Sequence, residues 1–317
     1  MFQHSGSSRA SYKVSADARA VDDVLPSHLS KEVLRSTKEF VGSTDRPVVS
    51  TEPNESSSTI GPETKIISKP PAILANSIRN GRKVVVLAST NAAFLDFTYN
   101  WLESVRRIGA LPYTVIVAED GAAFDALKNI SDVDVLRAGE LSSSKKLDWH
   151  TREYNLLVNK RPEHILNFLA KGYDVMWTDV DIVWLQNPFP YFEGDDYDLF
   201  SHVDLMLTPI THYLCSGFVY YKCNNKTIEL MTKWMEALAS LKGITPNQQS
   251  FKRVISKMVN LKIKTLNVTQ FVPGRNYFDK TWRKKHPEYK PVILHNNFIV
   301  GHDQKVNRFK QIGMWYI

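Results

Sequence analysis

The strongest constraint on the fold of this chain is an alternation of short apolar runs and amphipathic stretches that begins near residue 83. Apolar runs of this length, bounded by polar residues, predict buried strands, and the stretches between them have helical periodicity. In order, they predict strand 83–90, helix 94–109, strand 113–120, helix 122–130, strand 133–138, helix 164–172 and strand 173–185. Strands that alternate with helices in this way favour a parallel sheet with helices on both faces.

The second half of the chain alternates less regularly. Its segments predict strands 197–204 and 216–222, followed by helices 226–243 and 247–260. Strands that follow one another directly favour antiparallel additions to a parallel core. We therefore expect an α/β fold of single-domain, Rossmann-like type, with a mixed, mostly parallel sheet covered by helices.

Residues 1–80 differ from the rest of the chain in composition. They are rich in Ser, Thr, Pro and charged residues, and only 25–40 has the pattern of a short helix. Such a segment buries too little apolar surface to offset the entropy that it would lose on ordering. We expect a disordered stalk or linker over 1–80 and one folded domain over 81–317.

Composition and charge exclude several classes of protein. Of the 317 residues, 43% are hydrophobic and 23% are charged, which is typical of a soluble globular protein. No apolar run approaches the roughly 18–20 residues of a membrane-spanning helix, and the first residues lack the apolar centre of a signal peptide. The net charge is +7, but Lys and Arg do not cluster among aromatic residues as nucleic-acid binding requires, apart from the short run 282–290. We expect no nucleic-acid partner.

Covalent modification leaves few signals in the sequence. The two cysteines, Cys215 and Cys223, lie about 26 Å apart if the residues between them form a straight strand, because a strand rises ~3.3 Å per residue. That separation is too large for a disulfide bond. Sequons for N-glycosylation permit a secretory location without requiring it: Asn54, Asn129, Asn225 and Asn267.

Asp179 and Asp181 stand one residue apart within the apolar run 173–185. Carboxylates are rarely buried without a partner, and two of them at one strand end raise each other's pKa unless a cation lies between them. Mg²⁺ and Mn²⁺ are bound by one or two carboxylates together with substrate phosphates. Ligands of parallel sheets bind beyond the carboxyl ends of the strands, where we expect this pair and Asp120. The pair therefore predicts a site for a metal diphosphate.

Two other interpretations of the aspartate pair stay open. In the first, one aspartate caps a turn and the other makes a surface ion pair, which is the usual outcome for a lone Asp-x-Asp. In the second, DVDIV is the motif of an aspartate-nucleophile phosphatase. Those phosphatases have flexible turn residues after the motif, where this chain has Trp184, and a lysine before a second acidic pair, which is missing ahead of 194–198.

The run GYDVMWTDVDIVWLQNPFPYF at 172–192 resembles the signature of the nucleotide-diphospho-sugar transferase domain of glycosyltransferase family 77. The resemblance continues in order through the opening strand, 100–109, 216–221 and HNNFIVGHDQK at 295–305. The family includes plant UDP-xylose:fucose α-1,3-xylosyltransferases. The resemblance implies a GT-A-type fold, a UDP-sugar donor, a glycan or glycoprotein acceptor, and transfer with retention of anomeric configuration.

The resemblance also implies a metal site for Mn²⁺ or Mg²⁺ formed by Asp179, Asp181 and His295. Asp179 would in addition contact the nucleotide ribose, and His302 is a competing candidate ligand. A divalent ion at this place acts as a Lewis acid on the charge that develops on the leaving diphosphate. Asp179 and Asp181 are therefore candidate catalytic residues.

The candidate donor-binding residues come from several segments. Gly301 and Lys305 match family positions that contact the diphosphate, where glycine permits close approach of the backbone and lysine supplies a point charge. Lys160 precedes the helix that leads into the aspartate strand, where related transferases place a basic side chain on the donor. Thr90 and Asp120 stand at strand ends and are the geometric candidates for the base and ribose.

The candidate acceptor-binding residues are Gly217, Asn247, Gln248 and Asp204. Gly217 would permit close approach of a sugar, and Asp204 would orient an acceptor hydroxyl. Related families have Asp-Gln where this chain has Asn247 and Gln248, so a carboxylate is missing. We expect Gln248 and Lys305 to share the catalytic role with the aspartate pair.

These inferences predict a retaining, metal-dependent glycosyltransferase that moves a sugar, best guessed as xylose, from a UDP-sugar to a glycan. The alternative is a catalytically weak or inactive protein of the same fold that binds nucleotide sugars or carbohydrates. We expect a location in the Golgi lumen as a type II membrane protein whose anchor is absent here, or secretion.

Overall fold

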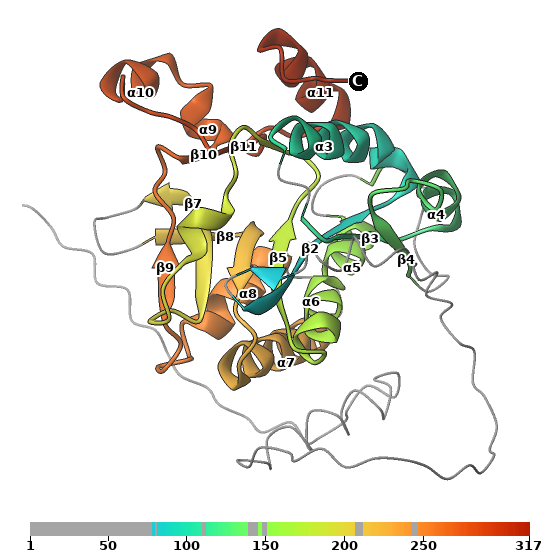
Figure 1. The fold of residues 1–317 in the computed structure, drawn as a ribbon, viewed down its shortest axis with the longest axis vertical. Coiled ribbons are helices and arrows are strands. Elements are labelled where there is room, and N and C mark those ends of the chain that lie inside the picture. The colour runs from blue at the N-terminus through green and yellow to red at the C-terminus, as the bar shows by residue number, and fades with distance from the viewer. Residues whose placement is uncertain are drawn as a thin grey trace, which may run out of the picture.

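The computed structural model of the protein describes most of the chain from residue 78 onward (Figure 1). The described residues are 78–79, 81–109, 112–138, 145–147, 151–206, 212–241 and 246–317. Apart from Ile78 and Arg79, the expected stalk over 1–80 and its helix at 25–40 lie outside them.

The described part alternates strands and helices as the sequence predicts. The strands are β1 Ile78–Arg79, β2 Arg82–Thr90, β3 Thr114–Ala118, β4 Asp134–Arg137, β5 Tyr173–Thr178, β6 Ile182–Trp184, β7 Leu199–Met206, β8 His212–Tyr221, β9 Ile263–Thr265, β10 Phe271–Pro273 and β11 Ile293–His295. The helices are α3 Leu95–Arg107, α4 Gly121–Leu127, α5 Arg152–Val158, α6 Arg161–Leu169, α7 Asn225–Ser240, α8 Asn247–Ile255, α9 Gly274–Tyr277, α10 Lys280–Lys285 and α11 His302–Gln311. Short 3₁₀ helices occur at Ala92–Phe94 and Phe189–Phe192.

The main sheet has the strand order β4-β3-β2-β5-β8-β7-β9, with β1 paired to β2 outside this path. Strands β4, β3, β2 and β5 are parallel neighbours, whereas β8 is antiparallel to both β5 and β7. Strand β9 is parallel to β7, and β1 is antiparallel to β2. The expected α/β fold with a mixed, mostly parallel sheet is confirmed.

Helices cover both faces of this sheet, so that β2 is buried on two sides (Figure 1). Val84 and Val86 of β2 pack into one hydrophobic core together with Trp101 of α3. Val85 and Leu87 alternate with them and pack into a second core on the opposite face, which α6, α7 and α8 complete. A strand with both faces buried reads as a continuous apolar run, which explains the sequence of β2.

The prediction of one continuous strand over 173–185 is wrong. It is divided into β5 of the main sheet and β6 of a small sheet with the order β10-β11-β6. The Asp179 amide still donates to the Gly217 carbonyl of β8 at 2.7 Å, but the Asp181 carbonyl accepts from the Asn296 amide at 2.9 Å. The chain thus changes its hydrogen-bonding partner from β8 to the segment after β11. Asp179 and Asp181 lie at this change of sheet.

Other boundaries differ by a few residues. Helix α6 begins at Arg161, ahead of the predicted residue 164, because Pro162 suits the first turn of a helix, where no backbone amide is needed. Helix α8 ends at Ile255, short of the predicted residue 260. No element was predicted after residue 260, where the structure has β9, β10, β11 and α9 to α11. These elements close the face above α3.

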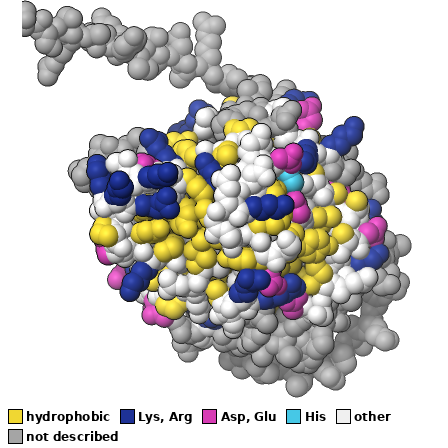
Figure 2. Space-filling model, turned by 90° about the horizontal axis from the view of Figure 1, so that it is seen from above, with side chains coloured by type: hydrophobic (Ala, Val, Ile, Leu, Met, Phe, Trp, Pro, Cys, Tyr) yellow, Lys and Arg dark blue, Asp and Glu magenta, His cyan; other side chains and the backbone are white. Residues whose placement is uncertain are grey.

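Seen from above, this face has mixed character, with Lys and Arg gathered on the side where α10 lies (Figure 2). Lys280, Lys284 and Lys285 of α10 are exposed. Within the part of the chain that the structure describes, no helix has the length and apolar character needed to cross a membrane.

Candidate active site

Each aspartate of the Asp-x-Asp pair has a basic partner. Asp179 Oδ1 accepts hydrogen bonds from Arg161 Nη2 at 2.7 Å and from Trp177 Nε1 at 3.1 Å. The Arg161 guanidinium also lies 4.9 Å from the centre of the Trp177 ring, which holds it by cation–π attraction. Arg161 is buried at the start of α6, so the Asp179 carboxylate is held in one orientation at the end of β5.

Asp181 is more deeply buried and lies between two donors. Lys305 Nζ of α11 lies 2.5 Å from its Oδ2, and His295 Nε2 at the end of β11 lies 3.3 Å from its Oδ1. Burial by itself would raise the pKa of Asp181, but the charges of Lys305 and His295 outweigh burial and hold the pKa well below its usual value. Asp181 is therefore ionised across the physiological range.

His295 responds to the same pair of forces in the opposite sense. Burial would lower its pKa, but the charge and hydrogen bond of Asp181 outweigh burial and raise the pKa above its usual value. Only the neutral imidazole is a metal ligand, so a cation that binds at Asp181 and uses His295 as a ligand would favour its neutral form.

The ligand atoms of Asp179, Asp181 and His295 all lie within 4.8 Å of one another. Carboxylate oxygens and an imidazole nitrogen are donors that divalent cations accept. Gly217 of β8 leaves the space that this cluster needs. A Cβ at Gly217 would lie 2.4 Å from Asp179 Oδ2 and 3.0 Å from His295 Cε1. The three predicted ligands therefore fit a divalent cation, although their atoms come from segments far apart in the sequence.

Gln248 and Asp204 lie on the β7 and β8 side of the site. Gln248 Nε2 donates to Asp204 Oδ2 at 2.8 Å, and Gln248 Oε1 accepts from the Ser216 amide at 3.4 Å. Asn297 Nδ2 donates to the second oxygen of Asp204 at 2.6 Å. Burial raises the pKa of Asp204, although His295, Gln248 and Asn297 oppose the shift. The structure thus brings Gly217, Gln248 and Asp204 together beside the aspartate pair.

Asn247 points away from this group. It is buried at the start of α8, and its Nδ2 donates to the Val158 carbonyl at 2.9 Å. Its own carbonyl accepts from Trp234 Nε1 at 3.2 Å. An aspartate at residue 247 could not donate to Val158, so the asparagine is explained by the packing of α8 against α5 and α7.

Thr90 and Asp120 lie at the carboxyl ends of β2 and β3, as predicted, but both are engaged in the fold. Asp120 caps α4, with Oδ1 accepting from the Ala123 amide at 2.9 Å and Oδ2 accepting from the Ala92 amide at 2.8 Å. The Thr90 hydroxyl is buried and accepts from the Thr98 hydroxyl at 2.8 Å. Among the described residues, no hydrogen bond or ion pair joins either side chain to the aspartate pair.

Lys160 ends in a different cluster from Asp179. Its Nζ lies 3.2 Å from Glu119 Oε2, and His164 Nε2 lies 2.8 Å from the other oxygen of Glu119. Glu119 is buried where β3 ends, directly before Asp120. Lys160 and Glu119 therefore form an ion pair at the carboxyl ends of the strands, next to the Arg161–Asp179 pair.

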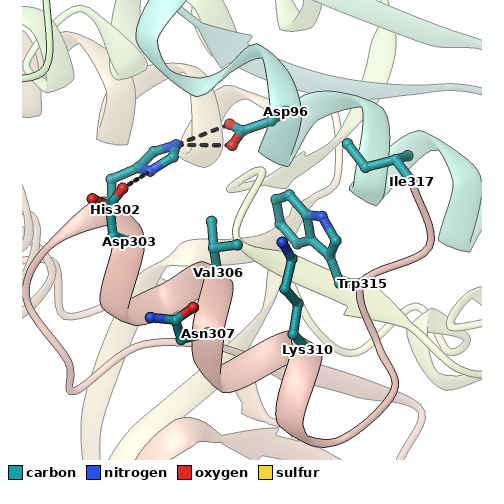
Figure 3. A pocket seen from close by; sticks show the side chains of 8 residues that line it. All are labelled: Asp96, His302, Asp303, Val306, Asn307, Lys310, Trp315 and Ile317. Atoms are coloured by element: carbon teal, nitrogen blue, oxygen red, sulfur yellow. Dashed lines mark hydrogen bonds and ion pairs between the residues drawn. The ribbon is translucent and has the colours of Figure 1, made fainter.

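Gly301 precedes α11 with a φ of 100°, a conformation that glycine adopts without strain. The helix it starts carries Lys305 to Asp181. His302 faces the other way, and its ring nitrogens lie 3.0 Å from Asp96 and 2.8 Å from Asp303 (Figure 3). His302 is therefore placed outside the Asp179–Asp181 group.

The same three residues line an open hollow of about 460 Å³ between α3, α11 and the C-terminal residues (Figure 3). Trp315 and Lys310 form its opposite wall. The hollow includes none of Asp179, Asp181 and Lys305. Helix α11 has His302 on the side of the hollow and Lys305 on the side of Asp181, so it separates the two places.

Arg161 and Asn297 contact the site and were not among the predicted residues. Arg161 follows Lys160 directly, and only the phase of α6 decides which of these adjacent basic side chains reaches Asp179. Asn297 lies within the segment 295–305, and its amide character gave no signal among neighbouring polar residues. His202 and Cys215 also lie beside His295, and sequence reasoning assigned neither a role.

Comparison with known proteins agrees with this geometry. The model of the nucleotide-diphospho-sugar transferase family matches residues 109–309. A UDP-D-xylose:L-fucose alpha-1,3-D-xylosyltransferase of Arabidopsis thaliana is 30% identical over 257 residues, which cover 74% of this chain and 69% of the relative. A UDP-galactose:fucoside alpha-3-galactosyltransferase of Dictyostelium discoideum is 26% identical over 76% of this chain and 44% of the relative.

Among solved structures, the chain is similar to the glycosyltransferase GlyE of Streptococcus pneumoniae TIGR4, with a TM-score of 0.48 and 15% identity over 74% of this chain and 61% of that chain. The family match extends from the end of α3 to α11 and includes the aspartate pair, Gly217, Gln248, His295 and Lys305. On the strength of the family match and the relatives at 30% identity, the chain belongs to the nucleotide-diphospho-sugar transferase family of glycosyltransferases.

Proposed function

We propose that the protein is a metal-dependent glycosyltransferase that moves a sugar from a UDP-sugar to a glycan acceptor with retention of anomeric configuration. Xylose is the preferred sugar, because the relatives at 30% identity are named as UDP-D-xylose:L-fucose alpha-1,3-D-xylosyltransferases. Galactose and arabinose come next, since relatives named for them are 26%, 22% and 21% identical.

The observation that carries the proposal is the convergence of Asp179, Asp181 and His295 at the break between two sheets, with Lys305 bound to Asp181. A divalent ion, Mn²⁺ or Mg²⁺, bound by these three residues would neutralise charge on the leaving diphosphate. Lys305 adds a point charge at the same place. Arg161 donates to Asp179 and holds its carboxylate in one orientation, so Asp179 does not have to reorganise when the donor binds.

The acceptor side of the site is formed by Gln248 and Asp204. The Gln248 amide is fixed at both ends, by Asp204 and by the Ser216 amide, which suits it to orient a sugar hydroxyl. Retention follows if the acceptor oxygen attacks C1 from the face that the diphosphate leaves. The C1–O bond electrons then go to the β-phosphate, and that phosphate takes the acceptor proton.

The rival proposal is a protein of the same fold that binds nucleotide sugars without turnover. Its support was the missing carboxylate at Asn247. The Asn247 amide packs against Val158 and does not reach Asp204 or Gln248, so its identity leaves the charges around the aspartate pair unchanged. This placement favours the enzyme. The phosphatase interpretation has no support from the family.

We further propose that 1–80 is a linker, that 81–317 is the catalytic domain and that the protein works in the Golgi lumen. Three sequon asparagines of the described region, Asn129, Asn225 and Asn267, are exposed, as glycosylation in the secretory pathway requires. Immunostaining of the full-length protein in the cytosol would contradict the location.

The function is tested by incubating the protein with UDP-xylose, UDP-galactose and UDP-arabinose in Mn²⁺ and following the release of UDP. We expect slow donor hydrolysis for one of them, lost in EDTA and restored by Mn²⁺. Asp181→Asn should lower turnover roughly 100-fold or more, on the scale of losing one charge-stabilising group. It should weaken UDP binding only when Mn²⁺ is present.

The matched control is Asp125→Asn, which removes an exposed carboxylate of α4 that forms an ion pair with Lys128. It should leave both hydrolysis and UDP binding unchanged. UDP binding without turnover for any donor would favour the rival proposal. An equal loss of UDP affinity in EDTA and in Mn²⁺ for Asp181→Asn would show that Asp181 does not act through a metal.

A further inference from the structure

A second cluster of metal-binding side chains lies directly behind His295, on the side away from Asp181. It consists of His202, Asp204, Cys215 and His295, whose ligand atoms all lie within 4.8 Å of one another. All members are buried, and the His202 and His295 rings have centres 5.6 Å apart. We call this group the buried tetrad.

The strand geometry explains why these side chains meet. His202 and Asp204 are two residues apart on β7, so their side chains leave the same face of the sheet. Opposite them, the pairing of β7 with β8 is irregular. Ser201 pairs with Val219 and Val203 with Leu214, so β8 has residues 215–218 where β7 has His202 alone. This bulge turns Cys215 toward His202 and Gly217 toward Asp179.

His202 lacks the partners that a buried histidine ordinarily has. Its side chain has no exposed surface, and neither ring nitrogen makes a hydrogen bond of ordinary geometry within the described residues. Asp204 Oδ1 lies 3.9 Å from its Nδ1, beyond hydrogen-bond distance. Burial lowers the pKa of His202, and a backbone contact with Phe271 opposes that shift. Burying a polar ring without partners is unfavourable, and a bound ligand would offset that cost.

Cys215 is the sulfur donor of the tetrad, and its thiol also interacts with the Asp204 carboxylate. Its Sγ lies 3.6 Å from His295 Nδ1 and accepts a weak hydrogen bond from the Gly217 amide at 3.4 Å. Burial raises the pKa of the Cys215 thiol, and the charges of Asp204 and Asp179 raise it further. A thiol in that environment is inert as a nucleophile, and only a bound cation would favour its thiolate.

We propose that the buried tetrad is a second metal site, distinct from the Asp179–Asp181 group, which binds a borderline-soft divalent ion such as Zn²⁺. One sulfur, two imidazole nitrogens and one carboxylate oxygen form a donor set that favours Zn²⁺ over the Mg²⁺ or Mn²⁺ expected at the aspartate pair. Tetrahedral Zn²⁺ separates its ligand atoms by about 3.3–3.8 Å, given bonds of about 2.0–2.3 Å. The ligand atoms of the tetrad lie within 4.8 Å of one another, so no pair is more than about 1.5 Å wider than in a bound site.

His295 belongs to both groups and connects them. A neutral imidazole has one proton, so one ring nitrogen is a ligand while the other donates. When Nδ1 binds the ion of the tetrad, Nε2–H points at Asp181 Oδ1, 3.3 Å away, which is the arrangement by which carboxylates orient metal-bound histidines. Occupation of the tetrad then withholds His295 from the aspartate pair. This last consequence rests on the proposed function, whereas the site itself does not.

The test is a titration of the full-length, EDTA-treated protein with Co²⁺ in the absence of nucleotide. Co²⁺ bound to a thiolate gives a charge-transfer band in the near ultraviolet, which oxygen and nitrogen ligands do not give. We expect this band at one equivalent of Co²⁺, and we expect Zn²⁺ to abolish it by displacement. Cys215→Ser should remove the band completely, and His202→Asn should weaken Co²⁺ binding about 10-fold or more.

Cys223→Ser is the matched control, because Cys223 is the second cysteine of the chain and its Sγ contacts the Leu169 carbonyl far from the tetrad. It should keep the band. Far-ultraviolet circular dichroism confirms that each variant is folded, and His202→Asn keeps the thiol if Cys215→Ser fails to fold. No band in the parent protein, or a band that depends on Cys223, overturns the proposal.

Discussion

Gly217 shows at the scale of one residue how this site depends on the absence of a side chain. Its amide and carbonyl belong to β8, and its carbonyl accepts from the Asp179 amide at 2.7 Å. The position where a Cβ would stand is already within 2.4 Å of Asp179 Oδ2 and within 3.0 Å of His295 Cε1. Real Cβ atoms do not approach other atoms so closely, so any larger residue would displace a candidate metal ligand.

We therefore predict that Gly217→Ala folds but loses Mn²⁺-dependent UDP binding by roughly 10-fold or more, since small displacements of positioned groups have effects of this size. Isothermal titration with UDP, in Mn²⁺ and in EDTA, measures the loss. Gly121→Ala is the control, because its Cβ would meet only the flexible Arg137 side chain at 3.4 Å. Unchanged UDP affinity in Gly217→Ala would place the diphosphate elsewhere.

Strand β5 is held at its start by an ion pair between the buried Asp174 and the partly exposed Arg82, and the contacts of Asp174 connect three strands. Asp174 accepts two hydrogen bonds from Arg82 of β2, at 2.6 and 2.7 Å, and one from the Tyr220 hydroxyl of β8 at 2.8 Å. It also accepts from the Cys223 amide at 2.7 Å. Because the aspartate pair follows β5 directly, this contact at the strand's start fixes the register with which β5 delivers Asp179.

We predict that Asp174→Asn destabilises the protein by about 2–4 kcal/mol. The N–H groups of the new amide would face the N–H and O–H donors that now bind the carboxylate. Asp132→Asn is the matched control. Arg106 and Asp132 have the same two-bond geometry, at 2.7 and 2.8 Å, but both side chains are partly exposed, so the cost should stay below about 1 kcal/mol. Chemical denaturation measures both, and equal losses would contradict the role of burial.

The described part of the molecule has two hydrophobic cores on opposite faces of the main sheet, and buried tyrosines lie in both. Tyr220 is 5% exposed and Tyr221 is fully buried on the other face of β8. Burial raises the pKa of both phenols above the ordinary range, and the charge of Asp174 adds to the shift at Tyr220. Neither phenol can ionise while the cores stay intact.

The difference between the folded-state and unfolded-state pKa of these two tyrosines predicts that the domain unfolds at alkaline pH. A group whose folded pKa is raised stabilises the folded state fully below its unfolded pKa, and loses that contribution as the pH rises above about 10. We expect the free energy of unfolding to fall above that pH and the last tyrosines to ionise together with unfolding. Parallel titrations of tyrosinate absorbance and circular dichroism measure this, and complete ionisation in the folded protein would contradict it.

Local pattern was sufficient to predict much of this protein. The burial of β2 on both faces appears directly in its unbroken apolar run, and Asp179, Asp181 and Asp120 follow strands as expected. The segment 295–305 had no predicted secondary structure, yet its resemblance to a family motif still identified His295 and Lys305 as neighbours of the aspartates. Short β10 and β11 gave no periodicity, because three residues do not complete a pattern.

The sequence by itself determined most of the order of strands and helices up to residue 260 and the types of residue at the site, because burial imposes periodicity on neighbouring residues. Only the tertiary structure decided that the aspartate strand changes sheets, that Arg161 reaches Asp179 while Lys160 reaches Glu119, and that His202 and Cys215 meet behind His295. Those outcomes depend on strand order, register and helix phase, which are set by contacts between residues far apart along the chain.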